Sequence, residues 1–72
     1  MKATIQNIRK ENDRVIVFAH FEGVEVQDKT FVFQIEDATE DNIKTKIVEE
    51  KARLEVIEEK VDELQTLINL EI

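Results

Sequence analysis

The sequence predicts an α+β fold in which a three-stranded antiparallel β-meander is followed by one long C-terminal amphipathic helix. Residues 2–36 alternate apolar and polar side chains with a period of two, which is typical of half-buried strands. Residues 39–70 repeat apolar side chains at spacings of three and four, which is typical of a helix. Since no Gly-, Pro- or Ser-rich linker separates the halves, residues 1–72 are expected to form a single domain.

The first half is predicted to contain three short strands, at residues 3–10, 14–22 and 30–35. Asn12 and Asp13 separate the first two, and both residue types tolerate the positive φ of a tight hairpin turn. Gly23 marks a turn or a bulge, after which residues 24–26 are again strand-like. Asp28 and Lys29 are compatible either with a further turn or with a continuing strand. Such short connections force neighbouring strands to be antiparallel.

Alternation divides the strand side chains between two faces of the sheet. One face is expected to lie under the helix, and its apolar members are Val15, Val17, Ala19, Phe21, Phe31, Phe33 and Ile35. The opposite face carries Ile16, Phe18 and Val32, which would form an exposed apolar patch. Because one helix covers only one face, this patch is a candidate partner-binding surface.

The helix is predicted to begin after Thr39 and to run to about residue 69. Thr39 is a favourable N-cap, and Glu40 and Asp41 in the first turn interact well with the helix dipole. Such a helix would be ~45 Å long, whereas a typical six-residue strand spans only ~20 Å. About half of the helix is therefore expected to extend beyond the sheet.

A heptad repeat runs along this helix, with Ile47 at an a position. All but one of the a and d positions between residues 43 and 68 are apolar, and the exception is Glu50. We expect the a and d residues before Glu50, Ile43 and Ile47, to cover the sheet together with their neighbour Val48. The a and d residues after Glu50 are expected to form a coiled-coil seam between copies. The predicted oligomerisation residues are Leu54, Ile57, Val61, Leu64 and Ile68. Leu54 is also compatible with covering the sheet.

The β-branched residues at most a positions favour a parallel trimer or dimer, with the trimer slightly preferred. An ordinary core-facing stripe is the alternative interpretation of the same spacing.

Composition excludes several classes of function. The chain has 17 acidic and 10 basic residues, a net charge of −7, which argues against nucleic-acid or anionic-membrane partners. No apolar run approaches the ~20 residues that span a bilayer, and the N-terminal residues do not form a secretory signal peptide. There is no cysteine and one histidine, so neither a metal site nor any other cofactor is expected.

The sequence contains three candidate catalytic or metal-binding groups. His20 has no nucleophile or further ligand near it in the sequence, and is expected to be a partly exposed strand residue. The acidic residues Glu36, Asp37, Glu40 and Asp41 lack the spacing of a calcium loop and suit the start of a helix. Glu22 and Glu25 are expected to be solvated turn residues. We therefore predict that the protein is not an enzyme.

The segment "DRVIVFAHFEG" followed by "KTFVFQIEDATEDNIKTKIVEEKARLE" resembles small proteins of tailed bacteriophages. In these proteins an F-x-F strand leads through an acidic-Thr cap into an I-K-x-x-I helix. The matching residues are Phe31, Phe33, Thr39, Ile43, Lys44 and Ile47, within about residues 13–55. The resemblance implies a virion-associated or phage-encoded accessory protein, located in the virion or the host cytoplasm. It supplies no site residues.

Two functions follow as predictions from these patterns. The first is a non-catalytic structural or assembly protein that forms homo-oligomers through the helix and contacts other virion proteins. The continuation of the heptads beyond Glu55 departs from the phage pattern and favours fibre- or collar-like assembly. The alternative is a small adaptor or inhibitor that binds another protein with the face carrying Ile16, Phe18 and Val32.

Overall fold

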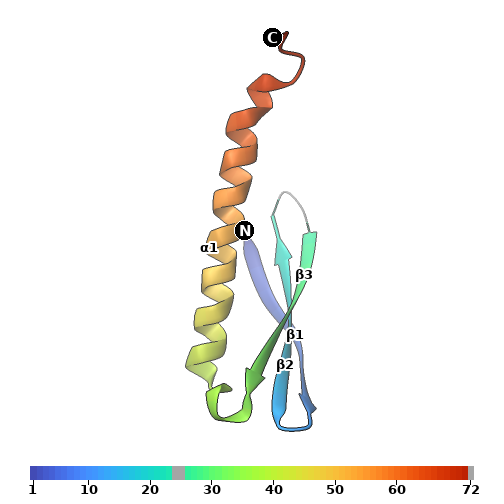
Figure 1. Cartoon of the computed structure of the whole chain (residues 1–72), viewed down its shortest axis with the longest axis vertical. Helices are drawn as coiled ribbons and strands as arrows, with labels where there is room; N and C mark the ends of the chain where they lie inside the picture. The colour runs from blue at the N-terminus through green and yellow to red at the C-terminus, as the bar shows by residue number, and fades with distance from the viewer. Residues whose placement is uncertain (24–25, 72) are drawn as a thin grey trace.

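The computed structural model describes residues 1–23 and 26–71, and it confirms the predicted α+β fold. Three antiparallel strands, β1 (Lys2–Glu11), β2 (Arg14–Glu22) and β3 (Val26–Gln34), form a sheet in the order β1-β2-β3. A 3₁₀ turn, η1 (Ile35–Asp37), leads into α1 (Glu40–Leu64), which ends in a second 3₁₀ turn, η2 (Gln65–Leu67). Figure 1 shows α1 lying along one face of the sheet and continuing past the first residues of β3. The molecule is elongated, measuring 55 × 20 × 17 Å.

The two turns of the meander follow the local sequence. Asn12, in the hairpin between β1 and β2, has a φ of 56°, the positive value that was expected there. Asp28 and Lys29 continue β3, which resolves the alternative left open by the sequence. Residues 24 and 25 of the predicted strand 24–26 lie outside the described residues, whereas Val26 begins β3.

A bulge in β1 explains why the apolar pattern of this strand is irregular. The register shifts between Ile5 and Asn7, so that Ile5 lies opposite Ala19 and Ile8 lies opposite Val17. Directly opposite residues of an antiparallel pair share a face. The bulge therefore brings two isoleucines three positions apart to the same side of the sheet, which simple alternation would not allow.

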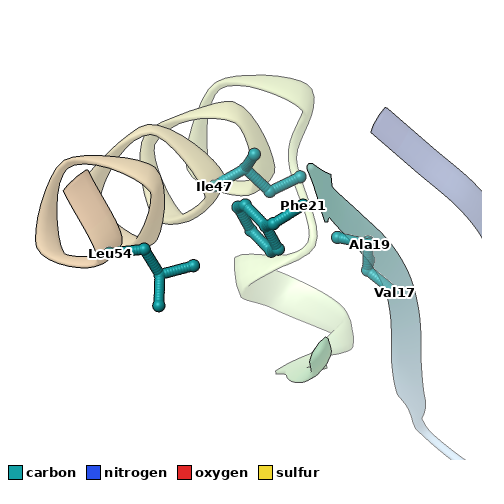
Figure 2. Close-up of a cluster of buried hydrophobic side chains, with 5 residues drawn as sticks. All are labelled: Val17, Ala19, Phe21, Ile47 and Leu54. Carbon is teal, nitrogen blue, oxygen red and sulfur yellow. The ribbon is translucent and has the colours of Figure 1, made fainter. Parts of the chain in front are cut away.

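The core lies between β2 and the first half of α1. Val17, Ala19 and Phe21 are at most 1% exposed, and they pack with Ile47 and Leu54 of the helix. Figure 2 shows Ile47 next to the ring of Phe21, with Leu54 about two turns further along. Further apolar residues pack partly buried around this cluster: Met1, Ala3, Val15, Phe31, Phe33 and Ile43. The predicted face of the sheet thus lies under the helix, except that Ile35 belongs to η1 and is 61% exposed.

The start of α1 was predicted correctly. Thr39 is the N-cap, and its Oγ1 accepts a hydrogen bond of 3.2 Å from the backbone N–H of Asn42. Glu40 and Asp41 occupy the first turn, where carboxylates are favoured by the helix dipole. The Asn42 side chain also donates to the carbonyl of Asp37, which joins η1 to the helix.

The end of the helix differs from the prediction. α1 stops at Leu64 and η2 at Leu67, after which Ile68 is extended and Asn69 has a φ of 69°. The last turn contains no basic residue, and its carboxylates, Asp62 and Glu63, lie near the negative end of the helix dipole, where they are unfavourable. The strands are also longer than expected, at nine or ten residues. The helix therefore extends beyond the sheet by less than half of its length.

Candidate interaction surfaces

Three exposed apolar residues lie in the second half of α1, at or beyond the end of the sheet. Ile57, Val61 and Leu64, here called the distal stripe, are 45%, 48% and 51% exposed. Val61 lies seven positions after Leu54 and so shares its side of the helix, yet Leu54 is only 4% exposed. The same helical face is thus buried by the sheet in its first half and uncovered in its second half.

Of the predicted oligomerisation residues, the structure brings Ile57, Val61 and Leu64 together on one exposed surface. Leu54 belongs to the core of its own chain, so it is not available for a seam between copies. Ile68 lies beyond the helical turns and cannot occupy a helical a position. Val48 was expected to cover the sheet but is 63% exposed.

Glu50 is not the boundary between the two halves. Its side chain is 16% exposed, it accepts hydrogen bonds from Arg53, and one carboxylate oxygen lies 3.8 Å from Nζ of Lys29. The hydrogen bond from Arg53 and the nearby Lys29 hold the pKa of Glu50 below its usual value. Because Lys29 projects from the helix-covered face of β3, opposite Ala19, the polar d position has a polar partner in the sheet. The boundary lies instead between Leu54 and Ile57.

A cleft of about 320 Å³ lies between the distal stripe and the first half of β3. Its apolar wall is formed by Leu54, Ile57 and Val61 of α1, and its polar lining is formed by Gln27 and Lys29 of β3 and by Arg53, Glu58 and Asp62 of the helix. The cleft is continuous with the exposed surface of the distal stripe, because Ile57 and Val61 belong to both. An apolar segment would therefore find an apolar wall here, with two cations and two carboxylates around it.

The predicted partner face on the other side of the sheet is less apolar than the sequence indicated. Ile16 is only 9% exposed and Phe18 is half-buried, with the guanidinium carbon of Arg9 4.9 Å from the centre of its ring. Val32 alone of the three is largely exposed, at 54%. Since Arg9 covers Phe18 with a cation–π contact, this face presents an interrupted patch.

His20 lies on the same open face and takes part in a small ionic cluster. Its Nδ1 is 2.6 Å from Oδ1 of Asp28, and its Nε2 is 3.2 Å from Oε1 of Glu22. The hydrogen bond with Asp28 is the main cause of a raised pKa at His20, because two carboxylates favour the imidazolium form. The sequence did not reveal this cluster, since it depends on the register that places Asp28 opposite His20.

The predicted acidic groups lie apart from one another or at the start of the helix. Glu40 forms an ion pair of 2.8 Å with Lys44, and Glu22 contacts His20, whereas Glu25 lies outside the described residues. Within residues 1–23 and 26–71, no three His, Asp or Glu side chains are grouped so that they could hold a metal ion. Every buried side-chain nitrogen or oxygen in this part of the chain has a hydrogen-bond partner.

Comparison of the chain with protein-family models, with curated proteins and with solved structures found no match. In the described part of the chain, no helix combines the length and the apolar character needed to cross a bilayer.

Proposed function

We propose that this protein is a non-catalytic assembly protein whose copies associate through the distal stripe of α1. The observation that carries the proposal is the contrast between Leu54, at 4% exposure, and Val61, at 48%, on one face of one helix. Burying a Val, Leu or Ile side chain completely gains about 1.5–3 kcal/mol relative to leaving it in water. If the distal stripes of two copies pack together, the three half-exposed residues of each copy are buried. Burial of these side chains gives a favourable free energy of association.

The open face of the sheet supports the alternative, an adaptor or inhibitor, less well. Ile16 is already buried within the chain and Phe18 is covered by Arg9, so that a partner would gain mainly the burial of Val32. Both ring nitrogens of His20 are engaged by carboxylates, which ties this residue to the ionic cluster. An assembly role therefore accounts better for the distribution of apolar surface.

The resemblance to tailed-phage proteins supports a more specific setting for this proposal. The matching residues Phe31 and Phe33 belong to β3, and Thr39 is the N-cap of α1, so the pattern coincides with real structural elements. We extend the proposal to a phage-encoded virion or accessory component that acts in the virion or the host cytoplasm.

The proposal is tested by the mass of the protein in solution. Size-exclusion chromatography with light scattering at micromolar concentration should give a multiple of the 8.4 kDa chain mass. Moderate salt is needed, because each copy carries a net charge of −7 and the repulsion between copies is screened at an ionic strength of about 0.15 M. A strictly monomeric wild-type chain under these conditions contradicts the proposal.

Val61→Asp should dissociate the assembly, because it places a carboxylate in the middle of the distal stripe. Val56→Asp is the matched control, since Val56 is 63% exposed but lies on a different side of the helix. The control should keep the wild-type mass. If both variants stay assembled, association through this stripe is wrong even though the protein is oligomeric.

A further inference from the structure

Building on the proposed function, we infer that the partner is one second copy in antiparallel orientation, whose tail, residues 67–71, docks in the cleft beside β3. The two copies exchange tails, so the arrangement is closed at a dimer. This differs from the parallel trimer or dimer that the heptad pattern alone favoured. Three features of the structure lead to it: the space around α1, the length of its exposed part, and the distribution of charge.

The sheet occupies the space that a parallel neighbour would need. Ile47 and Leu54 are buried against β2, and the distal stripe continues the same side of the helix. A parallel helix packed on this stripe lies only about 8–10 Å from α1 along its whole length. Its first half would then overlap the sheet. An antiparallel helix runs in the opposite direction, so its first half, with its own sheet, lies beyond the end of α1.

The length of the exposed part fixes the register of the pair. Gly23, just after β2, lies against Glu58, since a methyl group on Gly23 would collide with the carboxylate of Glu58. The sheet therefore reaches the level of Glu58, and the helical turns end at Leu67. If two such exposed parts overlap fully, Glu58 of one copy lies level with Leu67 of the other.

In that register Val61 lies level with Leu64 of the second copy, and Leu64 with its Val61. An a position then faces a d position, which is the pairing that an antiparallel coiled coil requires. The overlap is about 15 Å long at the rise of α- and 3₁₀-helices. The register that follows from the exposed length of the helix is thus one that the heptad pattern also allows.

The charges agree with this arrangement. The residues flanking the seam pair as Lys60 with Leu67 and Glu58 with Gln65, so like charges do not face each other. A register shifted by one heptad would oppose Lys60 with Lys60 and Glu58 with Glu58. A parallel pair would also bring together the two negative helix ends, each preceded by the acidic residues Asp62 and Glu63.

The tail and the cleft are complementary in apolar character. Leu67, Ile68 and Leu70 are 54%, 63% and 56% exposed, and the positive φ of Asn69 bends the chain between them. In the antiparallel register the tail of one copy arrives at the level of Leu54 and Ile57 of the other, beside the cleft. Glu71 then comes to the level of Leu54, at the part of the cleft that is lined by Gln27 and by Lys29 and Arg53, the two cations that pair with Glu50.

Disulfide trapping tests this arrangement, because the natural chain has no cysteine. Gln27→Cys and Glu71→Cys are purified separately, mixed, oxidised and run on a non-reducing gel. A disulfide-linked dimer should form in the mixture and be nearly absent from either variant alone, since only the cleft and the tail of different copies come within bonding distance. Asp13→Cys, at the far hairpin turn, replaces Gln27→Cys as the matched control and should give no mixed dimer with Glu71→Cys.

The outcomes separate this inference from the proposed function. If Glu71→Cys alone forms the linked dimer, or if the mixture gives none while light scattering shows an oligomer, the antiparallel exchange is wrong and self-association stands. A mass of three chains has the same consequence. If the wild-type chain is monomeric, the proposed function fails and the inference fails with it.

Discussion

The two halves of α1 carry the same sequence pattern and have opposite surroundings. Ile47 and Leu54 in the first half are 9% and 4% exposed, whereas Val61 and Leu64 in the second half are 48% and 51% exposed. Both pairs obey the same heptad spacing, and no glycine or proline separates them. The difference arises because the described strands lie along the first half of the helix, with Gly23, just after β2, against Glu58.

This comparison shows what a periodic apolar pattern can and cannot specify. The spacing fixes which side of the helix is apolar, and it does so equally well for both halves. What covers that side depends on the length of the strands and on where the helix ends. A helix that is covered for only part of its length is the physical basis for proposing self-association here.

The largest difference in stability between the two halves of α1 is expected when one leucine in each half is replaced by alanine. Leu54→Ala should lower the free energy of unfolding by about 2–5 kcal/mol, because it leaves a cavity in the buried core cluster. Leu64→Ala should change that of a dilute chain by less than about 1 kcal/mol, since half of this side chain is already in water. Urea denaturation followed by circular dichroism measures both variants.

Repeating the urea denaturation at several protein concentrations separates the effect of association from that of folding. If copies associate through the distal stripe, the loss caused by Leu64→Ala should grow as the concentration rises, whereas the loss caused by Leu54→Ala should be present at every concentration. Equal losses for the two variants in dilute solution would mean that the two halves of α1 are covered alike, contrary to the structure.

The sequence predicted the parts of the fold that depend on local chemistry. The hairpin at Asn12, the N-cap at Thr39 and the alternation of β2 were all recognisable, because each depends on residues close together in the chain. The only trace of the β1 bulge in the sequence is the odd spacing of Ile5 and Ile8, which does not fit simple alternation. The pairing register is needed to place both residues on one face.

The candidate sites were predicted less completely, because they depend on distances along the fold. Leu54 was expected to serve either the sheet or the seam, and only the true lengths of the strands assign it to the core. The cleft combines β3 with α1, and the His20 cluster combines β2 with β3. Residues from two elements meet in each case, so spacing within one element could not reveal them.

A smaller effect is expected from two glutamates that form ion pairs in the two halves of α1. Glu50 is largely buried between Arg53 and Lys29, whereas Glu63 pairs with Lys60 in water. Glu50→Gln should cost about 1 kcal/mol or less at neutral pH, and Glu63→Gln should cost still less because exposed pairs are screened.

The pH dependence of the Glu50→Gln variant follows from the lowered pKa of Glu50. A carboxylate whose folded pKa lies below its unfolded value stabilises the protein above the unfolded value, which is 4.5 here. This stabilisation is lost as the pH falls through the folded pKa. The difference between wild type and Glu50→Gln should therefore shrink below pH 4.5 in urea titrations. A difference that is independent of pH would contradict the role given to the charged form of Glu50.

The smallest effect concerns the two faces of the sheet, which differ as the two halves of the helix do. The covered face is held mainly by apolar contacts, with the Lys29–Glu50 ion pair at its edge, whereas the open face carries His20 between Asp28 and Glu22. Because the folded pKa of His20 is raised above 6.5, its contribution to stability is fully present below pH 6.5 and is lost as the pH rises through the folded pKa. Thermal unfolding of the wild type should therefore occur at a slightly lower temperature at pH 8 than at pH 6.

His20 is the only histidine, so a proton NMR titration of its ring reports the pKa of this site directly. Asp28→Asn should lower that pKa more than Glu22→Gln does, because the hydrogen bond to Asp28 is the shorter one and the main cause of the shift. Asp28→Asn should also reduce the change in unfolding temperature between pH 6 and pH 8. A wild-type pKa at or below 6.5 would show that the two carboxylates do not hold the imidazolium in solution. His20 would then be available to a binding partner on the open face. That result would favour the adaptor hypothesis over self-association.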